Sequence, residues 1–303
     1  MLKEPLLFLA RQESIRQFVV SNGVARRVAR RFVAGETLDD AIAAAKAVNR
    51  KGISATLDHL GENTSDIHEA QATAQGYRAM IDRIEAEGIE ANISIKLTAL
   101  GLDISPECCA ENLDHVLSRA AEAGTFVRVD MEGSDYTQRT IDMVIAAHAR
   151  HPVVGTVLQT MLYRTPTDVE TLIEKGIRVR LVKGAYMEPS SVAYPRKADV
   201  DNQYEKLMLR LLERGTYPAI ATHDELMIEQ ARHYVASRGI TRARFEFQML
   251  YGIRRDLQEQ LAAEGYNVRV YVPYGTQWYP YLTRRMAERP ANLLFIMSNT
   301  LRG

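Results

Sequence analysis

The alternation of short β-prone runs with longer helical segments constrains this chain more than any other feature. After Gly52, runs rich in Val, Ile, Leu and Phe recur, and segments with apolar residues three or four apart separate them. The runs span residues 53–57, 93–97, 126–131, 153–159, 177–182, 219–222, 245–249 and 268–272. Strands that alternate with helices pair in parallel through right-handed crossovers. Eight such units predict closure into an α/β fold of the (βα)8 barrel type.

An open doubly wound sheet shows the same alternation and is the structural rival. Such a sheet usually carries a glycine-rich turn after its first strand. Here that turn reads TLDHLGENTS, which lacks the G-x-G-x-x-G pattern, and the chain has no Walker A sequence. We therefore predict one barrel over residues 52–303, preceded by a helical segment over residues 1–51.

Helix-capping signals support several of the predicted helices, which include 67–84, 108–121, 136–147, 201–214 and 224–238. Thr37 and Asp40 form a capping-box pattern before an alanine-rich run. Ser65, Ser105 and Thr165 stand where a side chain would cap the first turn of a following helix.

Composition bounds the function classes. The formal net charge is zero, so the chain has no overall positive field that would attract nucleic acid. The only cysteines, Cys108 and Cys109, are adjacent and cannot form a disulfide framework, which fits a reducing compartment. With neither a convincing signal sequence nor an eighteen-residue apolar run, we expect a cytoplasmic location. Four arginines at 26, 27, 30 and 31 leave two alternatives open, a solvated helix face or peripheral contact with an anionic membrane surface.

Polar residues occur at the end of every predicted strand. In a (βα)8 barrel the active site lies at the carboxyl ends of the strands, so a polar residue at each end predicts a binding or catalytic site. In chain order these residues are Asp58 and Glu62, Lys96, Asp130 and Glu132, Gln159, Arg180 and Lys183, Thr222 and His223, Gln248, and Tyr271.

The last predicted strand leads into a helical segment that adds further candidates. The apolar run ends near Pro273 and Gly275, and Tyr281, Arg284, Arg285 and Glu288 then follow three or four apart, before Pro290. Guanidinium groups beside aromatic rings suit a small anionic ligand.

Several kinds of chemistry find no pattern in the chain. The seven histidines never show HxH or HExxH spacing, so we expect no metal. A G-x-S-x-G nucleophile motif is also missing. A lysine at a barrel strand end can serve as a Schiff-base nucleophile, which makes an aldolase-type lyase using Lys96 or Lys183 an alternative.

Six segments of the chain resemble the proline dehydrogenase family, in its short monofunctional bacterial form. They lie in the same order at successive strand ends and cover the barrel from about Gly52 onward. The segments are SIKLTALG from Ser94, VRVDMEGS from Val127, RVRLVKGAYMEP from Arg178, ATHD from Ala221, FEFQMLYG from Phe245 and YVPYGTQWYPYLTRRMAERPAN from Tyr271.

The resemblance implies a distorted (βα)8 barrel that binds FAD noncovalently and oxidises L-proline to Δ1-pyrroline-5-carboxylate. Lys96, Arg284 and Arg285 would hold the proline carboxylate. Tyr271, Tyr281, Ala185 and Leu250 would wall the ring. Asp130 would lie beside flavin and substrate, with Arg180 near flavin N5, and these two form the catalytic pair. The remaining cofactor contacts implied are Gln159, Lys183, Gly184, Ala185, Tyr186, Thr222, His223, Gln248, Arg285 and Glu288.

The resemblance also implies supporting residues and partners. Glu62 would pair with Arg284 as a gate over the site, and Glu288 would orient an arginine. Electrons would pass to a membrane quinone. Flavin supplies the hydride acceptor, so the protein contributes orientation and electrostatics rather than a nucleophile. The sequence leaves the oligomeric state and the acceptor of the amine proton open.

Overall fold

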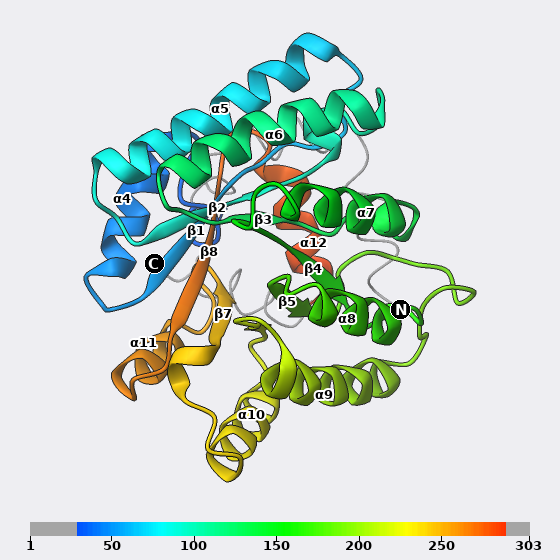
Figure 1. Ribbon diagram of the computed structural model, residues 1–303. Helices are drawn as coiled ribbons and strands as arrows, with labels where there is room; N and C mark the ends of the chain where they lie inside the picture. The colour runs from blue at the N-terminus through cyan, green and yellow to red at the C-terminus, as the bar shows by residue number, and fades with distance from the viewer. Residues whose placement is uncertain (1–28, 289–303) are drawn as a thin grey trace.

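The computed structural model describes residues 29–288, with side chains up to residue 283 (Figure 1). Eight parallel strands form one closed barrel in which each strand pairs with the next along the chain, and β8 pairs with β1. The predicted (βα)8 fold and all eight predicted strands are confirmed. The strands are β1 (Ser54–His59), β2 (Ala91–Ile95), β3 (Val127–Val129), β4 (Val154–Gln159), β5 (Val179–Val182), β6 (Ala219–Ala221), β7 (Glu246–Leu250) and β8 (Val268–Tyr274).

The predicted helices are also confirmed, although α9 begins before residue 201. The helices of the described chain are α4 (Leu38–Asn49), α5 (Ile67–Ala86), α6 (Pro106–Glu122), α7 (Thr137–His148), α8 (Thr165–Glu174), α9 (Lys197–Arg214), α10 (Glu225–Ser237), α11 (Arg255–Ala263) and α12 (Trp278–Glu288). Within the described part of the chain, the connections contain three short 3-10 helices, Thr98–Leu100, Ser134–Tyr136 and Arg242–Arg244.

Two of the four predicted caps are correct. Thr37 and Asp40 form the capping box of α4, and Ser105 accepts the Cys108 N–H at the start of α6. The prediction for Ser65 is wrong, because Asp66 caps α5 with a carboxylate that reaches two backbone N–H groups. Thr165 is not a cap either. It lies inside the first turn of α8, where its hydroxyl donates to the Gln159 carbonyl.

Helix α4, which precedes the barrel strands, lies outside the barrel where β8 pairs with β1 (Figure 1). It packs against β1 and β8 and also contacts α5. Its buried face consists of small and branched apolar residues, Ala41, Ile42, Ala44 and Ala45. Part of the segment 1–51 is therefore integral to the barrel wall, while the boundary at residue 51 stays a prediction.

The helix after β8 packs elsewhere. Trp278, Tyr281 and Leu282 of α12 form an apolar cluster with Val33 and Leu60. The segment before α4 runs along the end of β8, since the Ala34 N–H donates to the Pro273 carbonyl and the Gly275 N–H donates to the Gly35 carbonyl. Leu60 follows β1 directly, so this cluster lies at the carboxyl-end mouth of the barrel. α12 is thus placed near the predicted site.

Strand β8 extends further than the sequence indicated. We expected a break at Pro273, but the strand continues to Tyr274. Pairing with β7 ends at Tyr271, whereas pairing with β1 continues to Tyr274. Beyond Tyr271 the strand has one neighbouring strand, β1, and on its other side the Pro273 carbonyl accepts the Ala34 N–H, so a residue without an N–H is tolerated there.

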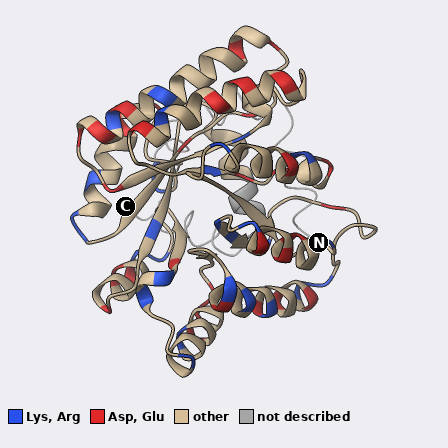
Figure 2. Cartoon of the chain, viewed as in Figure 1, with Lys and Arg blue, Asp and Glu red and all other residues tan. Residues whose placement is uncertain are grey.

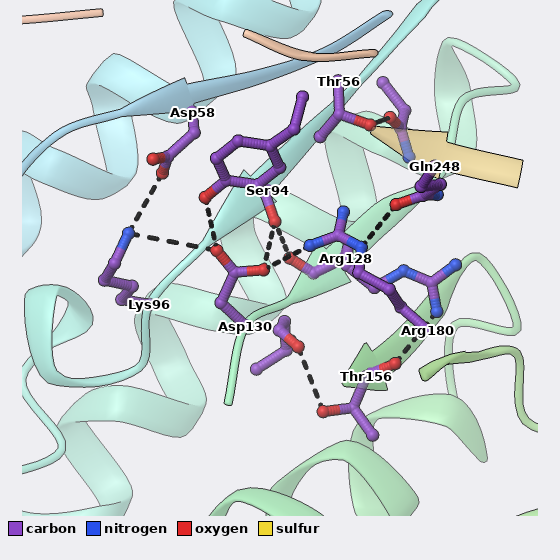
Figure 3. A network of polar contacts seen from close by, with 12 residues as sticks. Thr56, Asp58, Ser94, Lys96, Arg128, Asp130, Thr156, Arg180 and Gln248 are labelled. Carbon is purple, nitrogen blue, oxygen red and sulfur yellow. Dashed lines mark hydrogen bonds and ion pairs between the residues drawn. The ribbon is translucent and has the colours of Figure 1, made fainter. Parts of the chain in front are cut away.

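The strands separate apolar and polar side chains with a period of two. Ile93, Ile95, Val127 and Val129 are fully buried in the apolar core that includes the surrounding helices. The alternate residues carry polar groups that meet across the barrel (Figure 3). The interior of this barrel is therefore a polar network rather than the usual branched apolar layers.

Charges on the outer helices are of both signs and interspersed (Figure 2). Within residues 29–288, no helix is both long enough and apolar enough to span a membrane.

Candidate active site

Asp130, directly after β3, is the centre of the network at the carboxyl ends of the strands (Figure 3). Its Oδ1 accepts hydrogen bonds from the Ser94 hydroxyl at 2.6 Å and from Nη1 of Arg180 at 2.8 Å. Its Oδ2 accepts the Tyr271 hydroxyl at 2.6 Å. Strands β2, β5 and β8 thus each supply one donor to a single carboxylate.

The surroundings of Asp130 favour its ionised form. Burial alone would raise the pKa of this carboxyl, but Arg180 and Lys96 outweigh burial and lower it. The pKa of Tyr271 moves the other way, because burial and the neighbouring Asp130 both disfavour a phenolate. The pair is consequently a carboxylate that accepts and a phenol that donates.

Lys96 lies beside Asp130 in a buried position. Its Nζ is 3.1 Å from Oδ1 of Asp58 and 4.0 Å from Oδ2 of Asp130. Burial opposes the charge on Lys96, but Asp58 and Asp130 more than compensate and raise its pKa. The amine is therefore held as an ammonium, which suits an anionic ligand and not attack on a carbonyl.

Arg180 connects Asp130 to β7. Its Nε donates to Oε1 of Gln248 at 2.6 Å, and its guanidinium carbon lies 5.1 Å from the centre of the Tyr271 ring. Its Nη2 is buried and has no hydrogen-bond partner in the described chain, and the same is true of Oδ2 of Asp58. A buried donor and a buried acceptor without partners are costly unless a ligand satisfies them.

A second group of predicted residues follows β5. Nζ of Lys183 is paired with Asp201 at 2.7 Å and with Asp224 at 2.9 Å. Gly184 has φ +114°, and a Cβ added to it would lie 2.4 Å from Sδ of Met161. Only glycine fits this position, where the chain passes close to its neighbour.

Ala185 and Tyr186 are half-buried after Gly184. Tyr186 packs against the small apolar cluster that contains Met161 and Leu162. Leu250, half-buried at the end of β7, is joined to β6 by a hydrogen bond from its N–H to Nε2 of His223 at 2.9 Å. In a neutral His223 the proton is therefore on Nδ1.

Gln159 and Thr222 are fixed by backbone groups. Nε2 of Gln159 donates to the Glu132 carbonyl at 2.9 Å, and the Thr222 hydroxyl accepts the Asp224 N–H at 3.1 Å. Glu132 itself accepts the hydroxyl of Thr98 at 2.6 Å, and burial raises the pKa of its carboxyl. Gln159, Glu132 and Thr98 are thus linked by hydrogen bonds at this end of the barrel, and Thr222 is held separately beside Asp224.

The predicted substrate-binding residues of the last helix are only partly described. Tyr281 is buried in the α12 cluster. The side chains of Arg284, Arg285 and Glu288 lie outside the described residues, and so does the predicted pairing of Glu62 with Arg284. Glu62 is half-buried and is among the carboxylates whose charge acts on Lys96.

Sequence reasoning missed two groups of this centre, the Ser94 hydroxyl and the pairing of Asp58 with Lys96. Both follow the period-two alternation in NISIK and ATLD, where every second residue is polar. Among the described residues, no cluster of three or more His, Cys, Asp or Glu side chains is arranged to hold a metal ion.

Comparison with known proteins identifies the family. Residues 41–298 match the family model described as "Proline dehydrogenase". The chain is 40% identical over 302 residues to proline dehydrogenase 1 of Bacillus subtilis subsp. natto, which covers 100% of both chains. It is 44% identical over 283 residues to proline dehydrogenase of Deinococcus radiodurans, covering 91% of each.

A solved structure agrees with these matches. Proline utilization A (PutA) from Bdellovibrio bacteriovorus, inactivated by N-propargylglycine, superimposes with a TM-score of 0.80 at 27% identity. The match covers 86% of this chain and 32% of that larger one. With a barrel of matching architecture and a family model that spans most of its length, the chain belongs to the proline dehydrogenase family and is an oxidoreductase.

Proposed function

We propose that this oxidoreductase uses FAD to oxidise L-proline to Δ1-pyrroline-5-carboxylate, the first step of proline catabolism. The observation that carries the proposal is the centre formed by Lys96, Asp130, Arg180 and Tyr271. A buried ammonium, a carboxylate and a guanidinium meet there at the carboxyl end of a proline dehydrogenase barrel.

The described residues fit an FAD site. The buried Nη2 of Arg180 lacks a partner and would donate to an acceptor on the flavin edge. Lys183 and Gly184 offer a cation and a tight backbone passage for the rest of the cofactor, with Gln159, Ala185, Tyr186, Thr222, His223 and Gln248 as further proposed contacts. When bound, FAD would supply the acceptor for the hydride from proline C5, at flavin N5.

The substrate would be oriented by its carboxylate. Lys96 is held in the charged form, and Arg284 and Arg285 of α12 would complete the anion site with forked hydrogen bonds. Tyr271, Tyr281, Ala185 and Leu250 would enclose the pyrrolidine ring. Glu62 would pair with Arg284 as a gate over the site, and Glu288 would orient an arginine.

The charge state of the centre explains what the protein contributes. Asp130 remains ionised and Tyr271 remains protonated, so neither group needs to change charge as the substrate binds. Productive proline carries a neutral amine, and a buried site disfavours its ammonium form. Preorganised charges that need no rearrangement lower the barrier without covalent catalysis.

The absorption spectrum of the purified protein tests this proposal. We expect a yellow protein whose flavin band bleaches when L-proline is added without oxygen. A colourless preparation that cannot be reconstituted with FAD would rule out the flavin.

Arg285→Met should raise the KM for proline strongly, because each lost hydrogen bond to a charged carboxylate costs roughly 1.5–3 kcal/mol. An unchanged KM would place the carboxylate elsewhere.

The electron acceptor and the location form a separate part of the proposal. We propose that electrons pass to a membrane quinone, and that the protein is cytoplasmic with peripheral contact at the inner face of the membrane. Turnover with a soluble quinone, compared with molecular oxygen, tests the first statement. Cosedimentation with anionic vesicles, and its loss at high salt, tests the second.

The lyase alternative has lost its support. Lys96 is kept charged by two carboxylates, and Lys183 is paired with Asp201 and Asp224. Borohydride trapping of a carbonyl substrate on either lysine would restore that alternative.

A further inference from the structure

A cavity of about 460 Å³ opens at the amino-terminal ends of the strands, on the opposite side of the barrel from Asp130. Its lining includes the first residues of β2 and β7 and the turns that lead into β3 and β5. Because all eight strands are parallel, these segments meet at one mouth. The volume is within the range of small-molecule sites.

Three arginines line this cavity, Arg128, Arg178 and Arg269. Arg269 has a carboxylate partner, Glu246, at 3.0 Å. Arg128 and Arg178 form no ion pair with any carboxylate in the described part of the chain. The inner wall of the cavity therefore holds more positive than negative charge.

The other acidic residues of the cavity lie at its rim. Glu85 and Glu90 are exposed, and Glu85 is already paired with Arg119 of α6. Neither carboxylate neutralises the two inner arginines.

Of the three arginines, Arg128 gives the strongest indication of a bound anion. Its side chain is only 2% exposed, and its Nη1 donates to the carbonyls of Thr156 and Arg178. Its Nε is buried and has no hydrogen-bond partner in the described chain. Glu246 acts on Arg128 without forming an ion pair. A buried cation without an ion-paired carboxylate and with an unused donor is unfavourable, and a bound anion reduces both penalties.

Aromatic rings hold the guanidinium groups in place. The guanidinium carbons of Arg128 and Arg178 lie 4.8 and 4.9 Å from the centre of the Phe126 ring. Arg178 also lies 5.1 Å from the ring centre of Tyr217, whose φ is +44°. A tyrosine in the left-handed region is strained, and such strain is often found at ligand sites.

Gly155 of β4 leaves the space that this arrangement needs. A Cβ at residue 155 would lie 2.3 Å from the Arg178 carbonyl oxygen, 2.8 Å from the Phe126 ring and 3.1 Å from Nη1 of Arg128. The two guanidinium groups are thus packed in defined positions at the cavity, instead of extending into water as surface arginines do.

We propose that this mouth of the barrel is a second binding site, which takes a small organic anion through an oxyanion group, carboxylate or phosphate, held by Arg128 and Arg178. Planar guanidinium groups bind both kinds of oxyanion through paired hydrogen bonds. The site is separate from the proposed proline site, since the interior network lies between them.

Calorimetric titration of the purified full-length protein tests the site without measuring turnover. Succinate and inorganic phosphate are titrated in separate arms, each against sodium chloride of equal ionic strength. We expect saturable one-site binding in at least one arm, and the stronger arm identifies the oxyanion. Arg178→Gln should weaken that binding about tenfold or more, because a charge-assisted hydrogen bond is lost. Arg238→Gln, a change at the exposed residue directly after α10, should bind like the wild type.

Either of two results would overturn the proposal, namely no saturable binding in both arms, or the same affinity in Arg178→Gln as in the wild type. If Arg178→Gln does not fold, a wild-type crystal soaked in selenate decides. An anomalous peak within hydrogen-bond distance of Arg128 and Arg178 supports the site. Peaks only elsewhere, or none, refute it.

Discussion

The two mouths of this barrel are built from the same residue types but differ in charge balance. At the carboxyl-end mouth the two described cations of the Asp130 centre have carboxylate partners, Lys96 with Asp58 and Arg180 with Asp130. At the amino-end mouth Arg269 is paired with Glu246, whereas Arg128 and Arg178 have no carboxylate partner among the described residues. Paired charges keep one arrangement whether or not a ligand is bound. An unpaired buried charge, such as that of Arg128, is unfavourable until a ligand of opposite charge binds.

The largest expected effect comes from Arg180→Met at the carboxyl-end mouth. This change removes a counterion of Asp130 and the proposed donor to the cofactor, so kcat/KM for proline should fall about 100-fold or more. Steady-state kinetics measures the loss, and the absorbance ratio of flavin to protein shows whether FAD is retained. Arg180→Lys, which keeps the charge, should recover part of the activity. Full activity in the methionine variant would remove Arg180 from the proposed catalytic pair.

Glu246→Gln at the amino-end mouth should affect stability and leave the chemistry intact. The half-buried Arg269 would lose its carboxylate partner, which costs up to about 3–5 kcal/mol of unfolding free energy. Urea denaturation measures this loss. The kcat/KM of the folded variant should remain close to that of the wild type, because Glu246 lies at the amino-end mouth and its link to the proposed site is the hydrogen bond that it accepts from Nε2 of Gln248, which a glutamine oxygen can still accept. A large fall in kcat/KM at unchanged stability would show that the two mouths are not separable.

The same carboxylate predicts a pH dependence. Burial would raise the pKa of Glu246, but Arg269, Gln248 and Arg128 together lower it below its ordinary value of 4.5. The folded state therefore binds this proton less readily than the unfolded chain. The contribution of ionised Glu246 to the free energy of unfolding is complete above pH 4.5, and it is lost as the pH falls through the lowered pKa. Urea midpoints at successive pH values should fall below pH 4.5 in the wild type and fall less in Glu246→Gln.

Tyr271→Phe tests the carboxyl-end mouth with a smaller change. Asp130 would lose one donor to Oδ2 but keep Arg180, Ser94 and Lys96, so we expect a loss of about 1.5–3 kcal/mol, shared between stability and turnover. Measuring kcat/KM together with the urea midpoint separates the two. Tyr274→Phe, in the same strand, is the matched control. Equal effects from both variants would mean that the hydrogen bond to Asp130 carries no special weight.

Thr37→Ala should have the smallest effect. It removes the side-chain cap of α4, which costs about 1 kcal/mol. Because α4 packs on β1 and β8, the loss should appear in the global unfolding transition. If the helix only frayed locally, hydrogen exchange at the α4 amides would be faster while the global midpoint stayed unchanged, and this result would contradict the prediction. Thr37→Ser, which keeps a hydroxyl, should be nearly neutral.

Local patterns made much of this molecule predictable from the sequence. Apolar periodicity located all eight strands, and the carboxyl-end rule placed Lys96, Asp130, Arg180 and Tyr271 together. Distances between strands that are not neighbours in sequence were beyond such reasoning. Whether Lys96 lies nearer to Asp58 or to Asp130 depends on the stagger of the closed sheet, which no single strand encodes.

The amino-end mouth was harder to predict for a similar reason. Arg128 and Arg269 occupy alternate positions in VRVD and VRVY, a pattern also typical of a strand with one solvated face. Only closure of the barrel turns those positions inward and brings them to one cavity. The place of α4 likewise required a contact between residues near 45 and near 270, which local periodicity cannot supply.

The position of α4 has a consequence for synthesis on the ribosome. This helix emerges among the first elements of the chain, while one of its two partner strands, β8, emerges among the last. At about 5–20 residues per second, the interval is on the order of ten to forty seconds. During this time the face of α4 that carries Ile42 has β1 and α5 beside it but lacks β8. We expect nascent chains that stop before β8 to recruit chaperones through this helix, and full-length chains to release them.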